Sequence, residues 1–121
     1  MATVTLVMAW GPGLPEGSPG HRYEMSVTLD PQGHIDPAAW QADPNPWPAR
    51  RIWPAEPERH GDVQYDPEYG WSLRFFGGAA QAPDVPLQDV LQPSGPMRPG
   101  EYVGIREADG EDYGYRIVSV T

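Results

Sequence analysis

Apolar and polar residues alternate along several short stretches of the chain, a pattern typical of β-strands with one face in a protein core. The clearest stretch is 21–29, whose inward face would carry Tyr23, Met25, Val27 and Leu29. Residues 3–10 also alternate, with Val4, Leu6, Met8 and Trp10 on one face, but both faces are largely apolar, which favours a central strand. The loop at 11–20 is rich in glycine and proline, so the two strands are predicted to pair as antiparallel neighbours.

The C-terminal stretch 101–120 predicts a β-hairpin. Its turn is residues 108–110, Ala-Asp-Gly, which suit a three-residue connection whose glycine takes a positive φ. This turn fixes a register that pairs Arg106 with Asp112, Ile105 with Tyr113, Gly104 with Gly114 and Val103 with Tyr115. A slip by one residue would move the aliphatic side chains into water, so the pattern itself favours this register.

A second hairpin is predicted from residues 62–65 and 71–76. With a turn at 66–70, Tyr65 faces Trp71 and Val63 faces Leu73.

Two short helices are also predicted. Asp36 followed by Pro37 is typical of a helix start, and the helix would run to Gln41. Residues 85–91 have apolar residues at 87, 90 and 91, the spacing of one helical face.

Residues 43–60 form a connection rich in proline and tryptophan. Each residue before a proline is driven away from helical geometry, so an extended or polyproline conformation is expected over residues 43–48. We therefore predict one β domain over residues 1–121. It is all-β, with about six antiparallel strands in a small sandwich or half-open barrel and one or two short helices in the connections.

Charge narrows the range of functions. The chain of 121 residues has a formal net charge of −9, which repels nucleic acids and anionic membranes. Cysteine is absent, which excludes disulfides and fits a reducing compartment.

All eight basic residues are arginine, as is common in proteins from GC-rich genomes. With no long apolar run or leader pattern, a bacterial, cytoplasmic protein that binds no membrane is expected.

The candidate binding residues lie in and beside the proline-rich connection: Trp40, Trp47, Arg50, Arg51 and Trp53. Indoles offer flat faces for sugars, cations or prolines, and arginines offer paired contacts to carboxylates. A structural alternative is that the tryptophans cover an open end of the barrel while the arginines pair with acidic neighbours.

Catalytic and metal sites are weakly supported. His60 with Asp62 is a conceivable acid–base pair, and His34 lies near Asp36, but neither spacing matches a metal motif. The carboxylates near the last turn, at 107–112, are expected to solubilise it, with no apolar pocket to raise a pKa. We expect no catalytic residue, metal or cofactor.

The leading hypothesis is a non-enzymatic interaction module for a partner protein, with a basic protein as the favoured partner, as in an inhibitor or immunity protein. Charge would steer that association. An alternative is a small-ligand or carbohydrate-binding domain that stacks its ligand on tryptophan. A small hydrolase-like enzyme using His60 and Asp62 is the third hypothesis.

Overall fold

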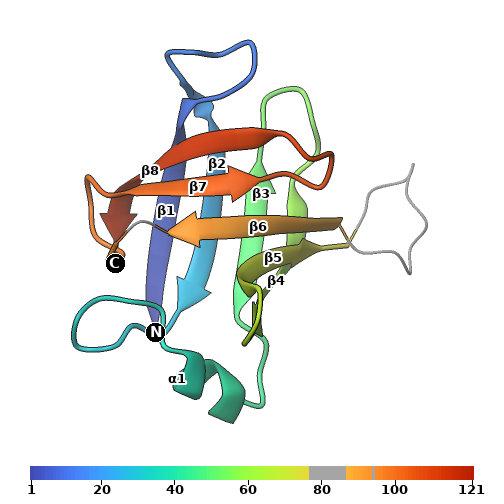
Figure 1. The fold of residues 1–121 in the computed structure, drawn as a ribbon. Coiled ribbons are helices and arrows are strands. Elements are labelled where there is room, and N and C mark those ends of the chain that lie inside the picture. The colour runs from blue at the N-terminus through green and yellow to red at the C-terminus, as the bar shows by residue number, and fades with distance from the viewer. Residues whose placement is uncertain (77–86, 94) are drawn as a thin grey trace.

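In the computed structural model, eight antiparallel strands form a closed barrel (Figure 1). Each strand pairs with the next along the chain, and the last pairs with the first. The strands are β1 (Ala2–Trp10), β2 (Ser18–Val27), β3 (Pro48–Ile52), β4 (Arg59–Asp66), β5 (Gly70–Phe75), β6 (Leu87–Pro93), β7 (Tyr102–Arg106) and β8 (Asp112–Val120). The structure describes residues 1–76, 87–93 and 95–121. The predicted all-β class is confirmed. The structure has eight strands where about six were expected, and its barrel is closed where a sandwich or half-open barrel was expected.

Both predicted hairpins are confirmed. β7 and β8 pair in the predicted register, with Arg106 opposite Asp112. Gly110 in their turn takes a φ of 91°, which an L side chain would resist. In the other hairpin, β4 and β5 place Val63 opposite Leu73, as the alternation predicted.

The predicted pairing of β1 with β2 is also confirmed, but one side chain lies on the other face. A register shift against β8 between Met8 and Trp10 turns Trp10 outward. There the indole lies over Gly114 and is 50% exposed. Gly114 therefore leaves room on the outer wall for a tryptophan side chain.

One predicted helix is confirmed and one is wrong. Helix α1 (Pro37–Ala42) begins as expected, with the Asp36 carboxylate accepting two backbone N–H groups. Residues 87–91 belong instead to β6, which pairs with β5 and β7; residues 85 and 86 lie outside the described residues. Three apolar residues at helical spacing are too few to outweigh pairing on both sides. In the part of the chain that the structure describes, no helix is long and apolar enough to cross a bilayer.

The connection predicted at 43–60 contains β3 and the first residues of β4, which corrects the expected continuous loop. Pro48 is the first residue of β3, where a missing N–H group is tolerated. Residues 49–52 contain no proline and pair with both β2 and β4.

Apolar side chains from all eight strands fill the barrel: Val4, Leu6, Met8, Tyr23, Met25, Val27, Ala49, Val63, Leu73, Phe75, Leu91, Val103, Ile105, Tyr115 and Ile117. Eight-stranded barrels are narrow enough for side chains to fill them in this way. We call the end with connections 11–17, 53–58 and 107–111 the mouth. The opposite end, with α1, is the base (Figure 1).

Tryptophans close the base. Trp47 is 1% exposed and stacks on Trp71, with ring centroids 6.2 Å apart and planes at 12°. Its indole N–H donates to Asp43 at 2.8 Å. Ile35 and Met97 complete this part of the core. The mouth is built differently, and the candidate site lies there.

Candidate functional site

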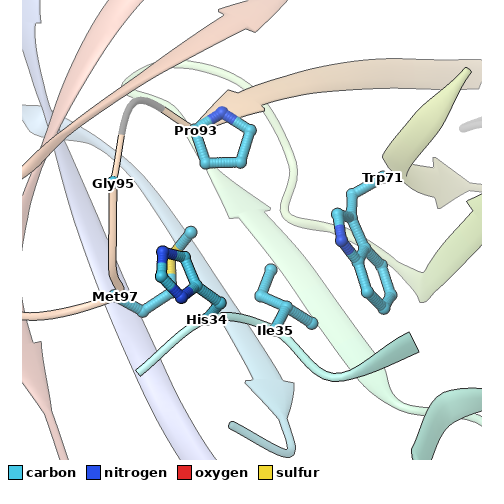
Figure 2. Close-up of a pocket in the computed structure, with 6 residues that line it drawn as sticks. All are labelled: His34, Ile35, Trp71, Pro93, Gly95 and Met97. Carbon is cyan, nitrogen blue, oxygen red and sulfur yellow. The ribbon is translucent and has the colours of Figure 1, made fainter. Parts of the chain in front are cut away.

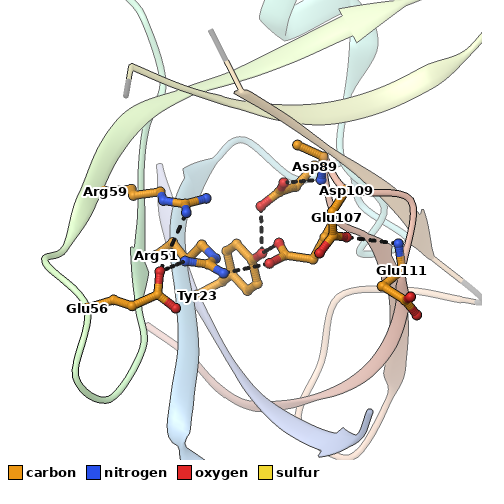
Figure 3. Close-up of polar contacts among 9 residues, drawn as sticks. Tyr23, Arg51, Glu56, Arg59, Asp89, Glu107, Asp109 and Glu111 are labelled. Carbon is orange, nitrogen blue, oxygen red and sulfur yellow. Dashed lines mark hydrogen bonds and ion pairs between the residues drawn. The ribbon is translucent and has the colours of Figure 1, made fainter. Parts of the chain in front are cut away.

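Four polar side chains are buried inside the barrel near the mouth: Tyr23, Arg51, Asp89 and Glu107. Figure 3 shows them converging from β2, β3, β6 and the end of β7. Each follows the alternation of its strand. Arg51 comes two residues after the buried Ala49, and Glu107 two residues after the buried Ile105. The sequence therefore directs polar groups into an otherwise apolar interior.

Arg51 and Glu107 form a buried ion pair. A guanidinium nitrogen of Arg51 donates to Glu107 at 2.6 Å, and the two residues are only 3% and 7% exposed. Removing two charges from water is costly, and attraction offsets this only with good geometry and further hydrogen bonds. Such a pair is weak evidence for stability, so a role beyond folding has to be considered.

The Tyr23 hydroxyl supplies one of those hydrogen bonds. It lies 2.5 Å from Glu107 Oε2 and 2.6 Å from Asp89 Oδ2. A hydroxyl has a single hydrogen, so it cannot donate to both carboxylates at once. One carboxyl group must itself be protonated to complete the network.

Of the two carboxyl groups, Asp89 is the one whose pKa is raised. Burial, and then the neighbouring Glu107, raise the pKa of Asp89 to about 7. Burial alone would raise the pKa of Glu107 too, but hydrogen bonds from Asp89 and Tyr23 and the charge of Arg51 hold it below its usual value. Asp89 also accepts the Ala108 backbone N–H at 3.2 Å, which links it to the last turn.

Trp53 covers the Arg51 guanidinium from the mouth side. The guanidinium carbon lies 3.5 Å from the centroid of the indole, and His21 and Tyr113 pack edge-on against the same ring. Arg51 Nε has no hydrogen-bond partner among the described residues. Orphaned donors of this kind occur where water, an ion or a ligand completes a network.

A cavity of about 390 Å³ opens above this ion pair. Arg51, Trp53, Glu56 and Arg59 line it from the β3–β4 side, and Glu107, Ala108 and Asp109 line it from the β7–β8 side. Figure 3 shows Arg51, Glu56 and Arg59 on one side of the mouth and Glu107 and Asp109 on the other. The volume lies within the range of small-molecule sites.

The five predicted site residues do not form one surface. Arg51 and Trp53 lie together at the mouth, whereas Trp40 and Trp47 lie at the base. Trp40 is half-buried and donates to the Val63 carbonyl at 2.9 Å. Arg50 points outward from β3, where it pairs with Glu24 at 2.5 Å and Glu58 at 3.5 Å.

These placements match the structural alternative, in which tryptophans cover an end of the barrel and arginines pair with acidic neighbours. The physical reason is the alternation of β3, which sends Arg50 and Arg51 to opposite faces.

Two carboxylates of the site were missed by sequence reasoning. Glu107 was assigned to a solubilising turn, but it is buried. Continuing the inward positions 103 and 105 by one step would have placed it in the barrel. Asp89 was hidden by the wrong helix prediction, because its inward position is visible only when 87–93 is read as a strand.

The His60–Asp62 pair has no support from the geometry. His60 is exposed and lies 3.4 Å from Glu58. Asp62 accepts two hydrogen bonds from Arg74, at 3.0 and 2.8 Å, and a third from Gln64. Among the described residues, no three histidines or carboxylates are grouped closely enough to hold a metal.

A second cavity, of about 260 Å³, lies near the base (Figure 2). Its lining is mostly apolar: Ile35, Trp71, Pro93, Gly95 and Met97, with His34 alone contributing a titratable side chain. Ligand sites combine apolar walls with a few converging polar groups. The mouth provides those groups, so it is the stronger candidate.

The architecture defines a closed, eight-stranded up-and-down barrel with a polar cluster beneath one opening. No family model, curated protein or solved structure matches the chain.

Proposed function

We propose that the protein is a non-enzymatic binding barrel that holds a small polar molecule in the cavity at its mouth. The observation that carries this proposal is the position of the Arg51–Glu107 ion pair, buried directly beneath a cavity of about 390 Å³. The strands fix both charges, so the floor of the site is preorganised and loses little freedom when a ligand binds.

Three features support a small ligand. The cavity is of a suitable size, its lining mixes one indole with several charged groups, and Arg51, which lines it, has a buried Nε with no hydrogen-bond partner among the described residues. A narrow eight-stranded barrel has room for one small molecule at most. Trp53, from the predicted set, remains part of this site, and its stacking on Arg51 makes its indole a reporter of binding.

The test is a screen of a chemically diverse fragment library by NMR, following the Trp53 indole and the backbone N–H groups of Ala108 and Asp109. Fragments that bind the cavity are expected to shift all three together, and Trp47 at the base should not respond. If no fragment shifts the mouth signals of the folded protein, the proposed function is wrong.

A protein partner is the second candidate. Trp10 favours it, because a half-exposed indole on the outer wall combines with a formal charge of −9. Exposed tryptophans are enriched at the centres of interfaces, and charge would steer a basic partner. Capture of a stoichiometric basic protein at low salt by wild type, and its loss with Trp10→Ala, would support this candidate over the small ligand.

A further inference from the structure

Apart from Glu56, which lies beside the arginines, the charges that line the cavity at the mouth are divided by sign between its two sides. We propose that the ligand is a small zwitterion, whose carboxylate binds between Arg51 and Arg59 and whose ammonium group faces Asp109. This inference rests on the proposed function and names its ligand class. Two arginines lie on the β3–β4 side of the cavity, and Glu107 and Asp109 lie on the β7–β8 side (Figure 3).

The cationic side already holds an anion in a loose arrangement. Glu56 Oε1 lies 3.5 Å from a guanidinium nitrogen of Arg51 and 3.5 Å from one of Arg59. Optimal contacts between guanidinium and carboxylate are about 2.7–2.9 Å. The Glu56 side chain is 40% exposed, so its carboxylate can leave into water. We read Glu56 as an internal occupant that a ligand carboxylate replaces with shorter contacts.

The anionic side has capacity for a cation. One carboxylate oxygen of Asp109 accepts the Glu111 backbone N–H at 2.9 Å, which fixes the side chain at the rim. The negative potential acts on nearby Tyr113. Burial, and then the charges of Asp109 and Glu107, raise the pKa of its hydroxyl. An ammonium group here would reduce that repulsion.

The overall charge argues for a zwitterion over a simple anion. A simple anion would meet Arg51 and Arg59 but also Glu107, Asp109 and the field of a chain with a net charge of −9. A simple cation would meet the two arginines. Only a molecule with both charges complements both sides of the cavity, in the way that electrostatic complementarity selects partners.

The experiment titrates the protein with ω-amino acids of increasing length: glycine, 4-aminobutyrate, 6-aminohexanoate and 8-aminooctanoate. Hexanoate and hexylammonium are the matched single-charge controls. The Trp53 indole NMR signal and calorimetry report binding. One length is expected to bind about tenfold more tightly than either control, because a second charged contact is formed.

Two variants test the role of Glu56. Glu56→Gln is expected to strengthen hexanoate binding up to about fivefold, since it removes a weak competing ion pair. Glu58→Gln makes the same charge change two residues away, outside the cavity lining, and is expected to leave binding unchanged. Asp109→Asn should cancel the advantage of the amino acid over hexanoate.

Equal affinity for the amino acids and both controls, or equal effects of the two glutamine variants, would overturn the zwitterion inference. If the fragment screen finds only uncharged molecules in the cavity, the proposed function stands and the ligand class is wrong. If nothing binds the mouth, both fail.

Discussion

The hydroxyl oxygen of Tyr23 lies 2.5 Å from Oε2 of Glu107, across the interior of the barrel and 84 positions away in the chain. Strands β2 and β7 are not neighbours, so this contact joins walls that share no backbone hydrogen bonds. Asp89 in β6 lies 2.6 Å from the same hydroxyl, so the cluster also includes this third strand. Because one hydrogen serves two carboxyl groups, we expect the stability of the barrel to depend on the protonation of Asp89.

Asp89→Asn tests that dependence. The folded-state pKa of about 7 lies above the ordinary value of 3.8, so Asp89 contributes most stability at low pH. That contribution falls as pH rises from about 4 through 7, because the folded state then binds more protons than the unfolded state. Asparagine stays neutral at every pH. Relative to wild type, the variant's free energy of unfolding is expected to improve by about 2 kcal/mol between pH 5 and pH 8.

Urea unfolding of both proteins at pH 5 and pH 8 measures this difference. Asp112→Asn is the control, since Asp112 pairs with Arg106 on the exposed surface. It should leave the wild-type difference between the two pH values nearly unchanged. An Asp89→Asn protein that lost the same stability at both pH values would show that Asp89 is ionised throughout.

Glu107→Gln is expected to lower the free energy of unfolding by about 3–5 kcal/mol, because it leaves Arg51 charged inside the barrel with only the longer contact to Glu56, at 3.5 Å. The double variant Arg51→Met/Glu107→Met removes both charges and should recover much of that loss. Chemical denaturation at pH 7 compares the two. A double variant less stable than the single one would mean that the ion pair itself stabilises the fold.

Alternation in the sequence predicted much of the fold and part of this cluster. Tyr23 was placed inward correctly, and the last hairpin was predicted to the residue, because its short turn leaves one register. Glu107 follows from the same alternation, but its charge argued for the surface. Its burial depends on Arg51 and Asp89, which lie 56 and 18 positions away in the chain. The sequence near Glu107 does not indicate either partner.

The candidate binding residues lie in separate parts of the barrel, because the proline-rich connection contains a strand that its proline density concealed. Treating 43–60 as one connection grouped Arg50 and Arg51 with the tryptophans. The hydrogen bonds to β2 and β4 that convert part of this segment into β3 come from distant parts of the chain. Closure of the barrel is likewise a long-range property, since it requires β1 to meet β8.

Two glycines should respond differently to alanine. A Cβ on Gly61 would overlap the Arg74 carbonyl in the neighbouring strand, which cannot move without breaking the sheet. A Cβ on Gly114 would overlap the exposed indole of Trp10, which can rotate away. We expect Gly61→Ala to cost about 3 kcal/mol and Gly114→Ala less than about 1 kcal/mol.

Urea titrations measure both losses, and tryptophan emission of Gly114→Ala should shift to longer wavelength as Trp10 becomes more exposed. Similar losses in the two variants would show that the β4–β5 pairing adjusts more readily than a packed sheet should.

Trp47 provides the last test, because its burial separates a core role from a recognition role. Its ring stacks on Trp71 and its N–H donates to Asp43, so Trp47→Ala should cost about 3–5 kcal/mol. Trp10→Ala removes the same side chain from the outer wall and should cost less than about 1 kcal/mol. Thermal unfolding of the two variants gives the comparison. A Trp47→Ala protein with wild-type stability and impaired binding would show instead that Trp47 has the recognition role that the sequence predicted.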